Sequence, residues 1–246
     1  MSFSNDSIAA VICAAGSSAR MGGAKKEYMP LPGAPDSLTV LGAAVSAFAG
    51  VPEISYIAVV VPEDPETGEA AAQKALPLKI LDGSHKVRFV TGGSTRRASV
   101  LNALRALAAD APNYVLIHDG ARPWISPELI RRVITGVKQY RAVIPLLPLT
   151  ETPKETDLPL EGFVGCDSWG PVFIKQQLKR AFIGTAQTPQ AFAFPEILAA
   201  HEKTAAREGR DYTDDAEVWA EFCGPVAVVP GETGNRKITF KEDISC

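Results

Sequence analysis

The sequence predicts an α/β protein built around a mainly parallel β-sheet with helices on both faces. Two observations carry this prediction. Apolar runs of strand length alternate along the chain with segments whose apolar residues recur at helical spacing, which is the pattern of strand–helix–strand units. The chain has 246 residues, of which 46% are apolar and 22% charged, an ordinary globular composition that fits one domain, 1–246.

The strands are expected where apolar residues run without interruption. The first run, Ile8 to Ala15, has the character of a buried strand and breaks at Gly16 into a loop of small residues. Further runs of similar length follow at regular intervals along the chain. The expected strands are 8–15, 56–61, 87–91, 114–118 and 142–147.

The helices are expected between these runs, where apolar residues recur every three or four positions. The first has Asp36 or Ser37 as a candidate N-cap and is followed directly by Gly50. Ser126 and Pro127 have the pattern of an N-cap and a first-turn proline. The expected helices are 37–49, 66–76, one after Arg96 and one that begins at Ser126 and Pro127.

The segment 148–183 interrupts this alternation. It contains four prolines, three glycines and no sustained helical face. Long segments without regular structure are uncommon inside compact domains and usually have a function or are mobile. From the residues alone, the segment is either a functional projection or a surface insertion without function.

The loop after the first strand has the character of a phosphate site. Small residues leave its backbone N–H groups accessible, and Arg20, Lys25 and Lys26 follow at once. It is not a P-loop, because no Ser or Thr follows a Gly-Lys pair, and it lacks the three spaced glycines of a dinucleotide fingerprint. The alternative interpretation is a tight turn with solvated basic residues.

Charge and cysteine content exclude several other classes of protein. A net charge of −3 and a pI near 5.7 argue against a nucleic-acid or membrane-surface partner, for which we would expect a basic excess. The cysteines are scattered, and Cys13 is expected to be a packed thiol rather than a redox group. Because the cysteines are scattered and the chain has only three histidines, we expect no zinc site. The amino terminus lacks the pattern of a secretory signal, so we expect a cytoplasmic protein.

A series of motifs in a fixed order resembles one enzyme family. The opening A-A-G-S-S-A-R-M-G with K-E-Y-M-P-L is similar to that of the 2-C-methyl-D-erythritol 4-phosphate cytidylyltransferases. Later blocks match in order: T-G-G-S-T-R-R-A-S-V (91–100), H-D-G-A-R-P (118–123), A-Q-T-P-Q-A-F (186–192), T-D-D-A (213–216) and N-R-K-I-T (235–239). The resemblance implies a three-layer Rossmann-like nucleotidyltransferase fold. It also implies that about 148–183 form a β-arm that embraces the partner's arm in a homodimer, although the register between 155 and 177 is not fixed.

The implied reaction transfers CMP from CTP to 2-C-methyl-D-erythritol 4-phosphate and releases pyrophosphate. A phosphate monoester, with a second pKa of about 6, is already largely ionised near neutral pH and needs no general base. It needs positioning and relief of the repulsion between two anions. That requirement agrees with motifs rich in cations and small residues.

The resemblance also implies roles for individual residues. Arg20 and Lys26 match positions that stabilise charge on the α-phosphate. Lys25 stands where the family usually has proline, so two adjacent lysines compete for the second of these positions. Arg180, with Lys179 as its competitor, and Lys237 match positions that hold the phosphate of the polyol. Further substrate-positioning candidates are Asp119, Arg122, Thr152 and Thr188, and the CTP-binding candidates are Ala14, Ala15, Gly16, Gly93, Ser94 and Ser99.

Asp119 is also the candidate ligand for Mg²⁺, either directly or through water, because magnesium binds through few carboxylates plus substrate phosphates. It could instead accept a hydrogen bond from a polyol hydroxyl. Arg122 is expected to be structural or to orient Asp119. The pair Asp214 and Asp215 is interpreted, with Thr213, as the cap of a following helix.

Two other functions stay open from the sequence. One is a sister cytidylyltransferase that uses another polyol phosphate, such as ribitol 5-phosphate. The openings of those enzymes more often have L-A-G-G and H-D-A-V-R-P, which favours the first interpretation. The other is a nucleotide-binding protein without catalysis, and the joint presence of the candidate cations and Asp119 argues against it.

Overall fold

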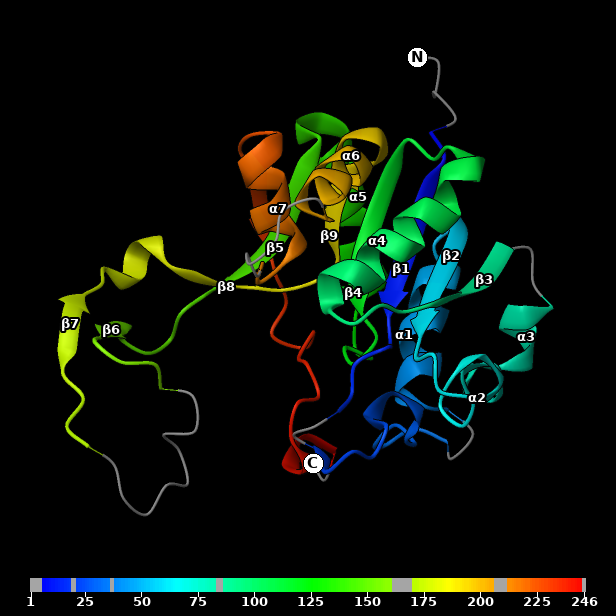
Figure 1. Cartoon of the computed structure of the whole chain (residues 1–246), viewed down its shortest axis with the longest axis horizontal. Helices are drawn as coiled ribbons and strands as arrows, with labels where there is room; N and C mark the ends of the chain where they lie inside the picture. Colours follow the sequence, from blue (N-terminus) through cyan, green and yellow to red (C-terminus); the bar gives the residue numbers. More distant parts are fainter. Residues whose placement is uncertain are drawn as a thin grey trace.

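An eight-stranded sheet runs through the centre of the protein, with strand order β10-β5-β9-β4-β1-β2-β3 and β8 paired to β5 (Figure 1). The computed structural model describes residues 6–18, 21–35, 38–82, 86–160, 170–205 and 212–244. Most neighbours are parallel, while β9 and β8 run antiparallel to their partners. The strands are β1 (Ile8–Cys13), β2 (Ile54–Val61), β3 (Lys86–Thr91), β4 (Tyr114–Asp119), β5 (Ala142–Pro148), β8 (Gly184–Ala186), β9 (Gln190–Ala193) and β10 (Ala227–Pro230).

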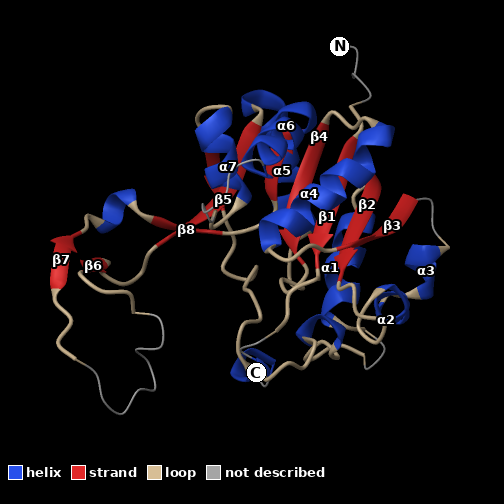
Figure 2. Cartoon of the chain, viewed as in Figure 1, coloured by secondary structure: helices blue, strands red, loops and turns tan. Residues whose placement is uncertain are grey.

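Helices cover both faces of this sheet (Figure 2). Side chains alternate along β1, so that Ile8 and Ile12 enter one apolar cluster with α1 and α5, while Ala9 and Val11 enter a second cluster with α4, α6 and α7. The predicted α/β fold with a mainly parallel sheet is therefore confirmed. The helices are α1 (Val40–Ala49), α2 (Glu69–Ala75), α3 (Leu78–Leu81), α4 (Arg96–Leu107), α5 (Pro127–Tyr140), α6 (Phe194–Ala205) and α7 (Asp215–Phe222).

Side-chain caps decide where the helices begin. Ser126 accepts the amide of Leu129 at 3.0 Å and caps α5 as predicted. The start predicted for α1 was three residues early, because Thr39 is its N-cap and accepts the amide of Gly42 at 2.9 Å. The expected caps Asp36 and Ser37 lie outside the described residues.

The second predicted helix also began too early. The carboxylate of Asp64 accepts the amides of Glu66 and Thr67 at 2.9 and 3.0 Å, which folds these residues into a turn. Helix α2 therefore starts only at Glu69. No helix in the described part of the chain is long and apolar enough to cross a bilayer.

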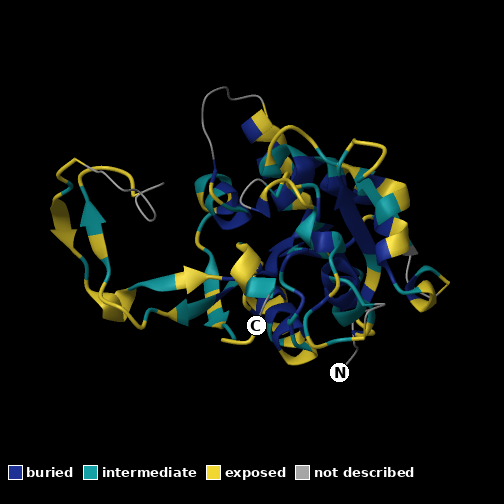
Figure 3. Cartoon of the chain, turned by 90° about the horizontal axis from the view of Figure 1, so that it is seen from below, coloured by how far each residue is buried: buried dark blue, intermediate teal, exposed yellow. Residues whose placement is uncertain are grey.

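A β-ribbon projects from the body between β5 and β8 (Figure 1). It pairs β6 (Lys154–Thr156) with β7 (Ile174–Gln177) in antiparallel fashion, within the segment expected to form an arm. Residues 161–169 of this segment lie outside the described part of the chain. Much of the ribbon is coloured as exposed (Figure 3). Apolar side chains on the ribbon and its return are among the exposed ones, with Phe173 64% and Phe182 86% accessible.

Candidate active site

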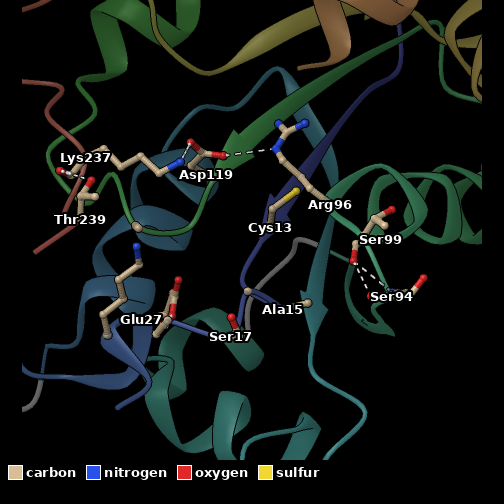
Figure 4. Close-up of a pocket in the computed structure, with 16 residues that line it drawn as sticks. Cys13, Ala15, Ser17, Glu27, Ser94, Arg96, Ser99, Asp119, Lys237 and Thr239 are labelled. Carbon is tan, nitrogen blue, oxygen red and sulfur yellow. Dashed lines mark hydrogen bonds and ion pairs between the residues drawn. The ribbon is translucent and has the colours of Figure 1, made fainter. Parts of the chain in front are cut away.

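A cleft of about 500 Å³ opens at the carboxyl edge of the parallel strands (Figure 4). Loops that follow β1, β3 and β4 form its floor and walls, and the residues after β10 close one side, as expected for a ligand site in an open α/β sheet. A Cβ on Gly92 would lie 2.6 Å from that of Ala15, so glycine allows the β3 loop to approach the β1 loop. The cleft is lined by Cys13, Ala15, Gly16, Ser17, Ser18, Lys26, Glu27, Gly93, Ser94, Thr95, Arg96, Ser99, Asp119, Ala121, Lys237 and Thr239.

Asp119 lies at the end of β4 with cations around its carboxylate. Nζ of Lys237 is 2.8 Å from Oδ2, Nε of Arg122 is 3.7 Å from Oδ2, and Nε of Arg96 is 3.8 Å from Oδ1. Burial alone would raise the pKa of this carboxyl, but Lys237 and Arg96 hold it well below its usual range. Asp119 is therefore ionised throughout the physiological pH range.

A buried hydrogen-bond chain fixes the backbone of Asp119. Its amide donates to Oγ1 of Thr188 at 3.1 Å, this hydroxyl contacts Nδ1 of His118 at 3.0 Å, and Nε2 of His118 lies 3.1 Å from the carbonyl of Arg122. Because a carbonyl only accepts, Nε2 carries the ring proton and Nδ1 accepts from the hydroxyl. Burial lowers the pKa of His118 to about 4, which agrees with a neutral ring.

The segment that carries Lys237 is tied to the loop after β4. Arg122 donates through Nη1 to the carbonyl of Asn235 at 2.8 Å, and the amide of Ile238 donates to the carbonyl of Ala121 at 2.9 Å. These bonds set Lys237 beside Asp119. Arg122 therefore holds this segment and also borders the Asp119 carboxylate, and its role in orienting Asp119 stays a prediction.

The two candidate lysines point to different places. Lys26 begins the short 3-10 helix η2 (Lys26–Tyr28), borders the cleft and donates to the carbonyl of Ile238 at 2.8 Å. Lys25 instead donates to the carbonyl of Gly16 at 2.5 Å and lies 3.6 Å from the carboxylate of Glu27, with a side chain only 9% exposed. The geometry therefore favours Lys26 as the lysine that meets a ligand.

The sequence profile of 2-C-methyl-D-erythritol 4-phosphate cytidylyltransferase (IspD) matches residues 8–246. The chain belongs to this family. A bifunctional enzyme IspD/IspF of Nitrobacter hamburgensis is 40% identical over 238 residues, which are 96% of this chain and 53% of the relative. The chain spans about half the length of the curated relatives it matches.

Solved structures of the IspD family share the fold. The 4-diphosphocytidyl-2C-methyl-D-erythritol synthase of Anaerococcus prevotii is 32% identical with a TM-score of 0.78, and the match covers 98% of this chain and 94% of that chain. The 2-C-methyl-D-erythritol 4-phosphate cytidylyltransferase of Thermus thermophilus is 28% identical with a TM-score of 0.69, covering 97% and 96%. The Rossmann-like nucleotidyltransferase fold predicted from the motifs is confirmed.

The residues expected to bind the nucleotide of an IspD protein gather at one end of the cleft. Ala15, Gly16, Gly93, Ser94 and Ser99 line it together. The amide of Gly93 donates to Oγ of Ser99 at 3.0 Å, which fixes the β3 loop against the start of α4. Ala14 is fully buried, and its amide donates to Val60 at 2.9 Å.

Not every residue predicted for the IspD site lies at this cleft. Arg180 and Thr152 belong to the projecting segment and are exposed, and Arg180 donates to the carbonyl of Thr150. Within one chain they are not brought to Asp119. Thr188 is buried in the connection between β8 and β9 and supports the backbone of Asp119, so its contact with a polyol stays a prediction. Arg20 lies outside the described residues.

Sequence reasoning missed part of this IspD cleft. Arg96 borders it and forms an ion pair with Asp215, whose Oδ2 is 2.8 Å from Nη2. The sequence did contain a signal for Arg96, because it belongs to the same T-G-G-S-T-R-R block as the candidates Gly93 and Ser94. Asp214 caps α7 as predicted, by accepting the amide of Glu217 at 2.9 Å, but Asp215 turns inward instead. Cys13 also lines the cleft, and burial raises its thiol pKa to about 12, so it stays protonated.

The donors at the cleft suit a magnesium ion that arrives with a nucleotide. Asp119 and Glu27 are the acidic residues among the described lining, and the described chain holds no cluster of three or more metal-ligating side chains. Mg²⁺ commonly binds through one or two carboxylates plus substrate phosphates. The ionised carboxylate of Asp119 is an oxygen donor of the kind that magnesium prefers.

Proposed function

We propose that the protein transfers CMP from CTP to 2-C-methyl-D-erythritol 4-phosphate, which gives 4-CDP-2-C-methyl-D-erythritol and pyrophosphate. The observation that carries this proposal is one cleft that holds a small-residue loop, Lys26, Asp119 and Lys237. Membership of the family and the names of its relatives supply the substrates.

The chemistry follows from the charges of the two substrates. An oxygen of the polyol phosphate forms a bond to the α-phosphorus of CTP, and the bond from that phosphorus to the pyrophosphate oxygen breaks. The attacking phosphate is ionised already, so the site has to bring two anions together in line. Lys26 and Arg20 would stabilise charge on the α-phosphate, while Lys237 would hold the phosphate of the polyol.

The nucleotide would lie along the loops after β1 and β3. Cytosine differs from uracil by its exocyclic amine and by N3 as an acceptor. Backbone groups of Ala14 to Gly16 and of Gly93 and Ser94, with the hydroxyl of Ser99, can match that pattern at close range. Small residues are needed there because the base must approach the backbone.

Magnesium, when bound, would neutralise phosphate charge and favour the departure of pyrophosphate. Asp119 would hold it, directly or through water. The same carboxylate pairs with Lys237 at 2.8 Å. It therefore links the metal end of the site to the residue that holds the polyol phosphate.

The arm would complete the site in a homodimer. Arg180 and Thr152 lie on the projecting segment, away from the cleft of their own chain. In a homodimer whose arms cross, these residues would reach the partner's cleft, with Arg180 on the polyol phosphate. The exposed Phe173 and Phe182 supply apolar surface for such a contact.

The test is pyrophosphate release by the purified protein with CTP and Mg²⁺. We expect turnover with 2-C-methyl-D-erythritol 4-phosphate and background rates with ribitol 5-phosphate. Turnover with ribitol 5-phosphate alone would keep the chemistry and reject the substrate. A folded protein that binds CTP and turns over neither substrate would reject the enzymatic proposal.

A further inference from the structure

A chain of ionisable side chains runs from the cleft into the buried helix layer behind it. Arg96, the first residue of α4, lies between the Asp119 carboxylate at the cleft and the Asp215 carboxylate at the start of α7. Behind Asp215, Nε2 of His201 on α6 is 3.3 Å from Oδ1. Asp215 is 1% exposed and His201 is fully buried. The proposed chemistry uses neither residue directly.

The sheet fixes Asp215 independently of the cleft. Oε1 of Gln190, on β9, accepts the amides of Asp215 and Ala216 at 3.1 and 3.0 Å. Nε2 of the same glutamine donates to Asp214 at 2.7 Å. The first turn of α7 is thus fastened to a central strand, and the Asp215 carboxylate is a fixed point rather than a mobile surface group.

Arg96 is held more closely by Asp215 than by Asp119. Its Nη2 is 2.8 Å from Oδ2 of Asp215. Its Nε, which faces Asp119 in Figure 4, is 3.8 Å from Oδ1 of that residue. The close partner of Asp119 is Lys237, at 2.8 Å. A guanidinium forms strong bidentate pairs with carboxylates, so an unrestrained Arg96 would compete with Lys237 for Asp119.

We propose that Asp215 is a positioning residue that holds Arg96 away from Asp119 and so keeps the Asp119 carboxylate paired with Lys237, the residue that would hold the acceptor phosphate. This inference rests on the proposed function for its kinetic consequence, but not for its geometry. The competing explanation is that the Arg96–Asp215 pair only joins α4 to α7. Burying a carboxylate for that purpose alone gains little, because desolvation offsets most of the attraction.

The first arm of the test is structural. In crystals of Asp215→Asn we expect the Arg96 guanidinium to turn and bring two nitrogens within hydrogen-bond distance of Asp119. The matched control is Glu217→Gln, which removes a carboxylate from the same first turn of α7 but away from Arg96. If Arg96 keeps its wild-type separation from Asp119 in Asp215→Asn crystals, the proposal is overturned, whatever reaction the protein catalyses.

The second arm is kinetic and separates positioning from folding. Asp215→Asn should lower kcat/KM for the polyol phosphate by about tenfold or more while KM for CTP changes by less than about twofold, with Glu217→Gln close to wild type. In an Arg96→Gln background, adding Asp215→Asn should change the rate by less than about twofold, because the two residues act as one unit. If the rate losses of the two single variants multiply in the double variant, Asp215 does not act through Arg96 and the proposal is rejected.

A milder variant covers the case in which Asp215→Asn does not fold. His201→Gln removes the ring behind Asp215 and keeps the carboxylate, so we expect a smaller effect with the same preference for the polyol phosphate. Equal effects on both substrates would contradict the proposal. A wild-type protein without turnover would reject the proposed function, and the crystallographic arm would still decide the role of Asp215.

Discussion

The cleft and the projecting β-ribbon use charged and apolar residues in opposite ways. At the cleft, charges from distant parts of the chain meet around Asp119, whose side chain is only 13% exposed and pairs with Lys237 and Arg96. On the ribbon, Lys175 pairs with Glu155 of the neighbouring strand and both side chains keep contact with solvent, while Phe173 and Ile174 are 64% and 54% exposed.

This difference separates a region that one chain can order by itself, the cleft, from a region that we expect to need a second chain, the ribbon. Contacts from several elements hold Asp119, Arg96 and Lys237, so the arrangement of these three groups is set within one chain. A two-stranded ribbon is marginally stable alone, and its exposed apolar side chains lack any cover from the described residues. We therefore expect the cleft to be insensitive, and the ribbon sensitive, to assembly with a second chain.

The largest effect is expected at the cleft. Lys26→Ala should lower kcat by about a hundredfold or more, because it removes a preorganised charge from the α-phosphate. Lys25→Ala is the matched control and should cost far less, since Lys25 binds the carbonyl of Gly16 instead. Pyrophosphate release measures both variants, and circular dichroism checks that they fold. If kcat falls further in Lys25→Ala than in Lys26→Ala, Lys25 is the lysine that contacts the α-phosphate.

The next test asks whether the ribbon serves a neighbouring cleft. Arg180→Ala and Lys26→Ala should each be nearly inactive, but mixing them after reversible dissociation should restore about a quarter of wild-type activity. In a symmetric dimer with crossed arms, half of the dimers are mixed and each mixed dimer has one complete site. Absence of recovery, despite mixed dimers seen by mass spectrometry, would place Arg180 in its own chain's site or outside any site.

A smaller effect is expected from the apolar surface of the ribbon. Phe173→Asp should raise the dimer dissociation constant by about tenfold or more, because burying a phenylalanine is worth about 1.5–3 kcal/mol. Leu78→Asp is the control, since Leu78 is 77% exposed on α3 of the body. Sedimentation velocity over a concentration series measures both. Equal weakening of the dimer by Leu78→Asp would move the interface away from the ribbon.

The smallest effect concerns the stability of the body against acid. His118 has a pKa of about 4 when folded and about 6.5 when unfolded, so the unfolded state binds more protons between these values. The contribution of neutral His118 to the free energy of unfolding is fully present above about pH 6.5. It is lost as the pH drops towards 4, by about 2 kcal/mol between pH 7 and 5. Urea unfolding at several pH values measures this slope, which His118→Gln should flatten. An unchanged slope in that variant would mean that other groups cause it.

Much of the body could be predicted from local patterns. Strands β1, β2, β4 and β5 lie at the apolar runs that predicted them, because a strand buried on both faces must be apolar throughout. The starts of α1 and α2 were predicted too early, since the side chains of Thr39 and Asp64 decide them through single hydrogen bonds. A periodicity argument does not detect such bonds.

The motifs predicted several residues that meet at the cleft, but contacts between side chains could be predicted only within a single motif. The Gly93–Ser99 contact is local and lies within one block. The pairing of Arg96 with Asp215 joins two helices that are distant in sequence, and neither residue shows by its type that the other is its partner. Strand β9 was missed for a related reason, because it is only four residues long and its antiparallel direction depends on β4 and β5.

The root of the ribbon has a consequence for how this protein could be altered. Pro148 at the end of β5 pairs directly with Gly184 at the start of β8, so the chain leaves and re-enters the body at neighbouring positions. The entropy cost of closing a loop grows only slowly with its length once the ends are fixed together. The excursion between them can therefore be shortened, extended or exchanged for that of a relative with little strain on the sheet. This makes it a natural junction for building chimaeras with altered subunit pairing.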